Sequence, residues 1–114
     1  MMPTQDKPLT DSLTVRPIGE YVRLWKRLVG CQQKYLDVPL GLLIEFLESK
    51  DKITPDHPSQ YSEDRDWIVT AVKGGGWFSI MKLDQDGEIQ RFLNLREFQM
   101  DRVMEWIRDF IPQF

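Results

Sequence analysis

The sequence predicts an α+β domain built from two N-terminal helices, a three-stranded antiparallel β-meander and a C-terminal helix packed on one sheet face. Three observations support this fold class. Apolar residues recur at helical spacing between residues 17 and 50, three short β-rich segments follow residue 66, and an amphipathic pattern closes the chain. Glycine-containing turns separate the three short segments, as antiparallel hairpins require.

The first helix is predicted to begin at Pro17, because proline suits the first helical position, where its missing N–H would have no partner. Gly30 would weaken its middle by about 1 kcal/mol, so we expect a bend there. The apolar positions that define this helix are Ile18, Tyr21, Val22, Trp25, Leu28, Val29, Tyr35 and Leu36. Residues 1–15 lack such periodicity and are expected to form a flexible N-terminal tail, followed by a single α+β domain over residues 16–114.

A second helix is predicted from about Pro39 to Lys50. Apolar side chains surround it almost completely, which indicates either a central core helix or a helix that meets another chain. Residues 51–66 are rich in proline and charge and are expected to form a loop. At sixteen residues this loop is longer than most connections, so it is expected to be either functional or mobile.

The three predicted strands are WIVTAVK, WFSIMKL and EIQRFL, which begin at Trp67, Trp77 and Glu88. Turns at residues 74–76 and 84–87 would join them. The last helix is predicted to open with Asn94 and Glu97, a variant of the capping box. Its apolar residues share one half of the circumference, and Pro112 would end it.

Composition is that of an ordinary globular domain, with 41% hydrophobic and 29% charged residues among 114. The net charge of −3 argues against a dedicated nucleic-acid binder, which usually has a basic excess. The lone Cys31 fits a reducing compartment, and the polar N-terminus does not resemble a signal peptide. The apolar run from Val38 to Leu47 is too short to cross a bilayer. We therefore expect a cytoplasmic protein without membrane association.

Residues that usually carry chemistry are scarce. His57 lies among acidic residues with no second imidazole or thiolate nearby, so the segment is interpreted as a solvated acidic loop instead of a metal site. The glycine triplet at 74–76 joins two predicted strands and therefore offers no helix N-terminus to a phosphate. Cys31 has no histidine in a local motif. The sequence predicts a non-catalytic protein without a cofactor or metal.

The favoured functional hypothesis is a small adaptor or regulatory protein that acts by protein–protein binding. The chain has more large apolar residues than its predicted core needs, and aromatic residues are frequent anchors in protein interfaces. The candidate protein-binding residues are Trp77, Trp106 and Phe114. The expected partner is another protein, or a second copy of this chain in a homodimer.

The alternative hypothesis is a nucleic-acid-binding regulator. At ~100° per residue, four basic side chains would form a stripe on the first predicted helix, opposite Trp25. These residues are Arg23, Lys26, Arg27 and Lys34. Such a stripe could bind phosphates, but it is also typical of the solvated side of an amphipathic helix, so nucleic acid is the less favoured partner.

Overall fold

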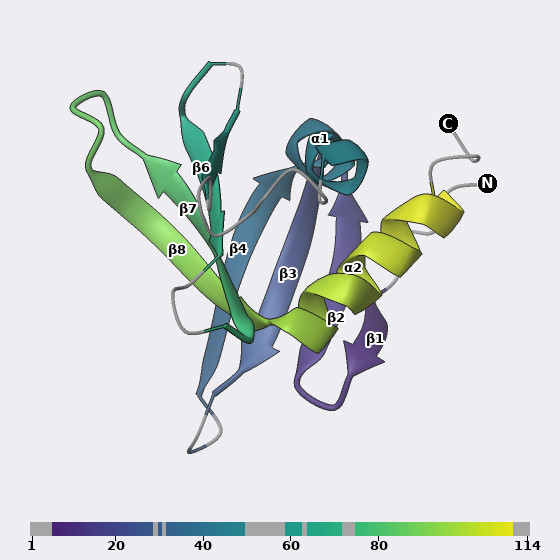
Figure 1. Ribbon diagram of the computed structural model, residues 1–114. Coiled ribbons are helices and arrows are strands. Elements are labelled where there is room, and N and C mark those ends of the chain that lie inside the picture. The colour runs from purple at the N-terminus through teal and green to yellow at the C-terminus, as the bar shows by residue number, and fades with distance from the viewer. Residues whose placement is uncertain are drawn as a thin grey trace.

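The computed structural model describes residues 6–28, 30, 32–49, 59–62, 64–71 and 75–110. The described chain forms two halves with the same order of elements, four antiparallel strands followed by one helix (Figure 1). The first half consists of β1 (Lys7–Thr10), β2 (Leu13–Ile18), β3 (Tyr21–Arg27), β4 (Gln33–Pro39) and α1 (Leu40–Ser49). The second half consists of β5 (Ser59–Tyr61), β6 (Trp67–Ala71), β7 (Trp77–Leu83), β8 (Ile89–Arg96) and α2 (Glu97–Phe110).

Each half forms its own sheet, with the strands in sequence order. In the first sheet (β1–β4), a two-residue turn joins β2 to β3, and Gly19 takes a φ of 59° at its first position, where a type II′ turn needs glycine. In the second sheet (β5–β8), Asp84 organises the β7–β8 turn. Its Oδ1 accepts hydrogen bonds from the N–H groups of Asp86 and Glu88, both at 2.9 Å, and Gly87 has a φ of 79°.

The core lies between the two sheets and the two helices. Alternate residues of β2, β3 and β4 point into it, and β8 adds Leu93 and Leu95 from the second sheet. α1 contributes Phe46, whose ring meets that of Phe78 edge-on with centroids 5.6 Å apart. Both helices contribute to this cluster, so they cover the face of the first sheet that carries Leu13, Val15, Val22, Leu24, Leu36 and Val38.

The predicted fold class is wrong, because the chain has two four-stranded antiparallel sheets and only two helices, one in mid-chain and one at the C-terminus. The first predicted helix is wrong, because its residues form the end of β2, all of β3 and most of β4. The second predicted helix corresponds to α1, and the expected meander corresponds to β6, β7 and β8, to which β5 adds a fourth strand. The predicted tail contains β1 and the start of β2, where Leu13 and Val15 are fully buried.

The last helix begins later than the sequence suggests. Asn94 lies within β8, and α2 starts at Glu97. Gln99, the third residue of α2, caps the helix instead. Its Oε1 accepts a hydrogen bond from the N–H of Arg96, the residue directly before the helix, at 2.9 Å. The Gln99 amide nitrogen donates to the hydroxyl of Ser12 at 2.8 Å. One buried side chain therefore joins the start of α2 to the β1–β2 turn.

Candidate functional site

The face of the first sheet that points away from the core carries aromatic and cationic side chains. We call this surface the outer face. On β3, every second residue from Tyr21 to Arg27 belongs to it, because side chains alternate along a strand. Its members are Thr14, Arg16, Ile18, Tyr21, Arg23, Trp25, Arg27, Gln33, Tyr35 and Asp37. Tyr21 and Tyr35 are each 48% exposed, far more than rings that serve a core.

Strand register arranges these side chains in rows across the sheet. Thr14, Trp25 and Tyr35 form one row, and Arg16, Arg23 and Asp37 form the next. Neighbouring rows on one face therefore alternate between rings and charges. The pattern places ring faces and charged groups side by side on one surface.

Arg23 is held firmly within this surface. Its Nε and Nη2 donate to the two carboxylate oxygens of Asp37 at 2.7 and 3.0 Å, in the bidentate geometry that fixes a guanidinium plane. The hydrogen bond to Asp37 is the main reason that the pKa of Arg23 is raised. The guanidinium carbon also lies 4.6 Å from the ring centroid of Tyr35 and 5.6 Å from that of Trp25. The two rings thus have one fixed cation beside them.

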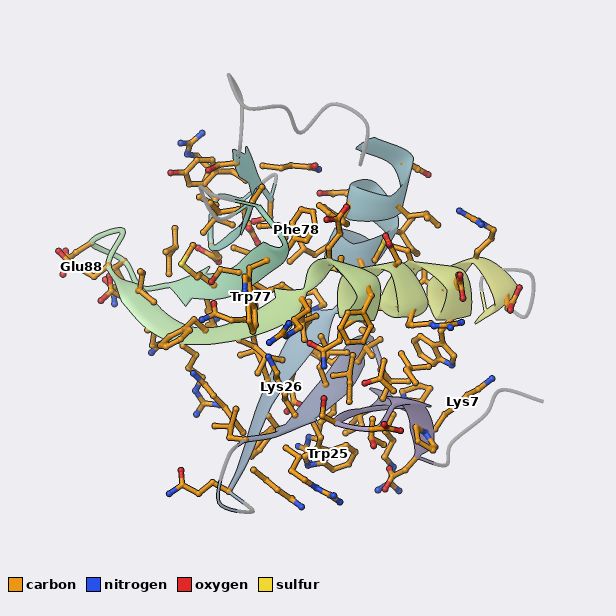
Figure 2. The ribbon with its side chains drawn as sticks, turned by 60° about the horizontal axis from the view of Figure 1, so that its bottom comes forward. Lys7, Trp25, Lys26, Trp77, Phe78 and Glu88 are labelled. Carbon is orange, nitrogen blue, oxygen red and sulfur yellow. The ribbon has the colours of Figure 1, made fainter. Side chains whose placement is uncertain are left out.

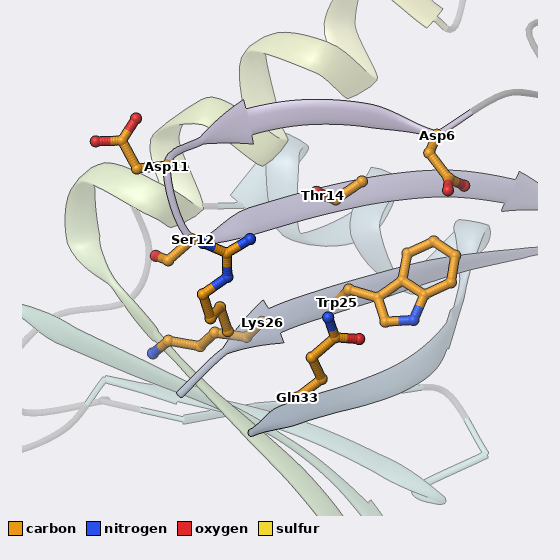
Figure 3. A pocket seen from close by; sticks show the side chains of 8 residues that line it. Asp6, Asp11, Ser12, Thr14, Trp25, Lys26 and Gln33 are labelled. Carbon is orange, nitrogen blue, oxygen red and sulfur yellow. The ribbon is translucent and has the colours of Figure 1, made fainter. Parts of the chain in front are cut away.

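A cavity of about 290 Å³ opens beside Trp25, at the end of the sheet where β3 stops and β4 begins (Figure 3). Thr14, Trp25 and Gln33 line it from three adjacent strands, and Arg27 stands at the same end of β3. The β1–β2 turn supplies Asp11 and Ser12, and Asp6 and Lys26 complete the wall. Hydrogen-bond donors and acceptors therefore surround one aromatic ring.

The predicted basic stripe does not exist as a helical stripe, because its residues lie on strands. Arg23 and Arg27 occupy the outer face, whereas Lys26 and Lys34, which are register partners, point to the opposite side. Helical spacing places residues 23, 26 and 27 together, but strand spacing separates odd from even positions. The structure therefore divides the four predicted residues into two pairs.

The second pair lies where the two sheets meet. The Lys26 amine donates to the backbone oxygen of Asn94 at 2.7 Å and sits 4.6 Å from the ring centroid of Trp77 (Figure 2). The Lys34 amine is 3.3 Å from the ring centroid of Phe92. Desolvation lowers the pKa of both lysines, and the charge of Arg96 lowers that of Lys26 further. Both amines thus contribute to joining β3 and β4 to the second sheet.

The structure describes two of the three predicted protein-binding residues, and these two lie in different surroundings. Trp77 is half-buried between Lys26 and Arg96, whose guanidinium carbon lies 4.8 Å from its ring centroid. Trp106 is 6% exposed and belongs to the core cluster. Phe114 lies outside the described residues. Of the three, only Trp77 lies near an open surface in the part of the chain that the structure describes.

Charge is strongly segregated between strands and helices. Within the strand bounds, Asp37 is the only acidic residue, while the basic residues are Lys7, Arg16, Arg23, Lys26, Arg27, Lys34, Lys82, Arg91 and Arg96. The helices hold the opposite balance, with Arg102 and Arg108 against Glu45, Glu48, Glu97, Asp101, Glu105 and Asp109. The net charge of −3 therefore conceals a basic pair of sheets and an acidic pair of helices.

Among the described residues, no group of three His, Cys, Asp or Glu side chains is arranged to hold a metal ion. His57 and Cys31 lie outside them, as does Gly74 of the glycine triplet. No helix in the described ranges is long and apolar enough to span a membrane.

Sequence reasoning did not identify Thr14, Tyr21, Trp25, Gln33 or Tyr35 as candidate site residues. A usable signal was present in YVRLWKR, the sequence of β3, where Val22 and Leu24 alternate with cations and rings. The same alternation continues through Leu36 and Val38 of β4. A period of two across both segments is typical of a half-buried strand.

Comparison with known proteins identifies the fold but no family. No family model matches the chain, and no curated protein matches its sequence. Among solved structures, a chain from the crystal structures of Trypanosoma bruciei MRP1/MRP2 is similar, with a TM-score of 0.52 and 9% identity. The match covers 97% of this chain and 81% of that chain. At this identity the likeness shows a shared fold alone.

Proposed function

We propose that this protein binds single-stranded nucleic acid on the outer face of its first sheet. The observation that carries the proposal is the row pattern of exposed rings and arginines on one surface. Tyr21, Trp25 and Tyr35 offer planes on which unpaired bases can stack, and stacking tolerates any base because every base has a π-face. Arg27 and Arg16, of which Arg16 lies 3.7 Å from Asp6, flank these rings and can neutralise backbone phosphates.

A single strand suits this surface better than a duplex. Rings that project from a sheet can reach the face of a base only when the base is unpaired, since duplex bases cover one another. Duplex DNA is commonly read by a basic helix in the major groove. Here α2, the longer of the two helices in the described residues, is acidic on balance, with Glu97, Asp101, Glu105 and Asp109 against two arginines.

The charge distribution supports the same assignment. A polyanion would approach the strands, where basic residues predominate, and would be repelled by the helices. Asp37 does not oppose this approach strongly, because its carboxylate is already paired with Arg23. Protein binding, the function first expected from the sequence, has less support, since Trp106 is buried and Trp77 is half-buried, whereas Tyr21 and Tyr35 are each 48% exposed.

The proposal is tested by measuring fluorescence anisotropy of a labelled unstructured oligonucleotide, alone and annealed to its complement. We expect the single strand to bind more tightly than the duplex. Tyr35→Ala should weaken binding by about 5- to 150-fold, because the loss of one stacking ring costs ~1–3 kcal/mol. Phe98→Ala is the matched control, because Phe98 is a similarly exposed ring on α2, away from the outer face.

Three results would count against the proposal. One is tighter binding of the duplex than of the single strand. Another is an equal effect of Tyr35→Ala and Phe98→Ala, which would mean that the outer face is not the contact surface. The third is the absence of any binding at low salt, combined with capture of a protein partner that Tyr35→Ala releases, which would restore the adaptor hypothesis.

A further inference from the structure

The cavity beside Trp25 has a chemistry that backbone phosphate alone would not need. Phosphate oxygens accept hydrogen bonds and carry negative charge, so a phosphate site is built from donors and cations. The lining of this cavity contains two cations, Lys26 and Arg27, but also two acids, Asp6 and Asp11, and the amide of Gln33. Carboxylates accept hydrogen bonds only, so they favour a ligand with N–H donors. A neutral, flat group with both donors and acceptors on its edge fits this lining.

The geometry around Trp25 leaves one direction for such a group. Toward Tyr21, the next residue on the same face is Arg23, which is fixed by Asp37 and lies 5.6 Å from the indole centroid. In the other direction, the next residue is Arg27, which lines the cavity together with Asp11 and Ser12 of the β1–β2 turn. Asp6 closes the cavity from the opposite end of β1, where it lies 3.7 Å from Arg16. Figure 3 shows Gln33 beside the indole, reaching from the neighbouring strand. A ring that enters the cavity would meet Trp25 on one side and polar edges on the others.

The wall contributed by the β1–β2 turn is held in place by the core. Ser12 accepts a hydrogen bond from the amide of Gln99, which is 2% exposed, at 2.8 Å. The Ser12 N–H donates to the hydroxyl of Thr10 at 3.3 Å, within the same turn. The turn that carries Asp11 is therefore anchored before any ligand arrives, which lowers the entropy cost of binding.

We propose that this cavity is a nucleobase subsite, which binds one unpaired base with an exocyclic amino group in preference to thymine or uracil. The inference rests on the proposed function and deepens it. The base stacks on Trp25, Arg27 neutralises the adjoining phosphate, and Gln33 and Thr14 contact the base edge. Cytosine and adenine present an amino donor where thymine presents a carbonyl oxygen. The amino group can donate to Asp6, the acid on the indole side of the cavity in Figure 3, whose carboxylate keeps further acceptor positions beside the Arg16 Nε at 3.7 Å. A carbonyl oxygen at the same place would be repelled.

The test compares binding of oligo(dC) and oligo(dT) of equal length, at a pH where oligo(dC) stays unstructured. Wild-type protein should bind oligo(dC) about tenfold more tightly than oligo(dT), as one discriminating base contact predicts. In Asp6→Asn/Asp11→Asn, this ratio should fall toward one because oligo(dT) is no longer repelled. Trp25→Ala should weaken binding of both oligonucleotides and also reduce the ratio. Tyr61→Ala, an exposed ring on β5, is the control and should preserve both affinity and ratio.

The outcomes separate the two proposals. Equal binding of oligo(dC) and oligo(dT) by the wild type would overturn the subsite while leaving single-strand binding intact. A preference for oligo(dC) that persists unchanged in Asp6→Asn/Asp11→Asn would also overturn it. Failure to bind any single strand would overturn both proposals. If Trp25→Ala does not fold, as judged by circular dichroism, Gln33→Ala replaces it and should reduce the ratio.

Discussion

Successive side chains of β3 serve two different surfaces. Trp25 lies on the outer face beside the cavity, while its neighbour Lys26 reaches Trp77 and the backbone oxygen of Asn94 on the opposite side (Figure 2). The separation follows from the alternation of side chains along a strand. A single strand can therefore present a binding surface and at the same time attach its sheet to the other one.

A second residue-scale feature is the turn before β6, which Asp64 organises. Its Oδ1 accepts hydrogen bonds from the Ser62 hydroxyl at 2.6 Å and from the N–H of Asp66 at 3.0 Å. The Ser62 hydroxyl oxygen in turn accepts a hydrogen bond from the N–H of Trp67 at 3.1 Å. The bond from Ser62 is the main cause of the lowered pKa of Asp64, whose usual value is 3.8.

This turn predicts a pH dependence of stability. Because the pKa of Asp64 is lower in the folded than in the unfolded chain, its ionised form stabilises the fold above pH 3.8. That contribution is lost as the pH falls through the folded-state pKa. We expect Asp64→Asn to melt at a lower temperature than wild type at neutral pH, and the two melting temperatures to converge in the acid range. A difference that stays constant across thermal melts from neutral to acid pH would contradict this account.

At the scale of elements, the segment from Pro17 to Leu36 shows why part of the fold could not be predicted. In β3, both faces carry large apolar groups, since Val22 and Leu24 fill the core while Tyr21 and Trp25 lie outside. Because the outward residues Tyr21 and Trp25 are also large and apolar, the sequence does not show the alternation of apolar and polar residues that is typical of a strand. The core residues and the outer rings together recur at the three- and four-residue spacing that is typical of a helix. The feature that misled the secondary-structure prediction is thus the feature that makes the outer face a candidate site.

Elements without this conflict were predictable. α1 is apolar on most sides and is buried, with Leu43 fully inaccessible. β6, β7 and β8 were separated by clear turn residues, of which Gly87 adopts the expected left-handed conformation. The candidate site was predictable only in part, because Arg23 and Arg27 were identified while the rings between and beside them were assigned to a core.

The junction between α2 and the β1–β2 turn allows a test at the element scale. Gln99 is 2% exposed, caps α2 through the N–H of Arg96 and donates to Ser12. Gln99→Met preserves the approximate volume but leaves both partners without these bonds. We expect a loss of about 1–3 kcal/mol in the free energy of unfolding, measured by chemical denaturation. Ser12→Ala removes one of the two bonds and should cost less. A cost of Gln99→Met below that of Ser12→Ala would show that the cap is not important.

At the scale of the whole molecule, the two sheets and two helices divide the charge. Strands carry most of the described cations, and Asp37 is the only carboxylate within their bounds. The helices sit on the core side of the first sheet, so its outer face is left for a ligand (Figure 1). Net charge alone argued against a polyanion as ligand, because a sum over the chain contains no information on where the charges lie.

The last prediction separates this local charge from the net charge. For a single strand, the logarithm of affinity falls with the logarithm of salt concentration by about 0.7 per neutralised phosphate. Arg16 and Arg23 are partly neutralised by Asp6 and Asp37, so Arg16, Arg23 and Arg27 together should give a slope between about −1 and −2.

Two charge reversals then distinguish the outer face from the rest of the molecule. Arg27→Glu should make the slope less steep by about 0.7, because it removes one phosphate contact. Arg108→Glu, on α2, alters the net charge by the same amount and should leave the slope unchanged within error. Anisotropy titrations over a series of salt concentrations measure both slopes. If the two variants reduced the slope equally, affinity would depend on total charge and no localised surface would be needed. A wild-type slope near zero would instead indicate a ligand held by apolar contacts, as in the adaptor hypothesis, because such contacts release no counterions.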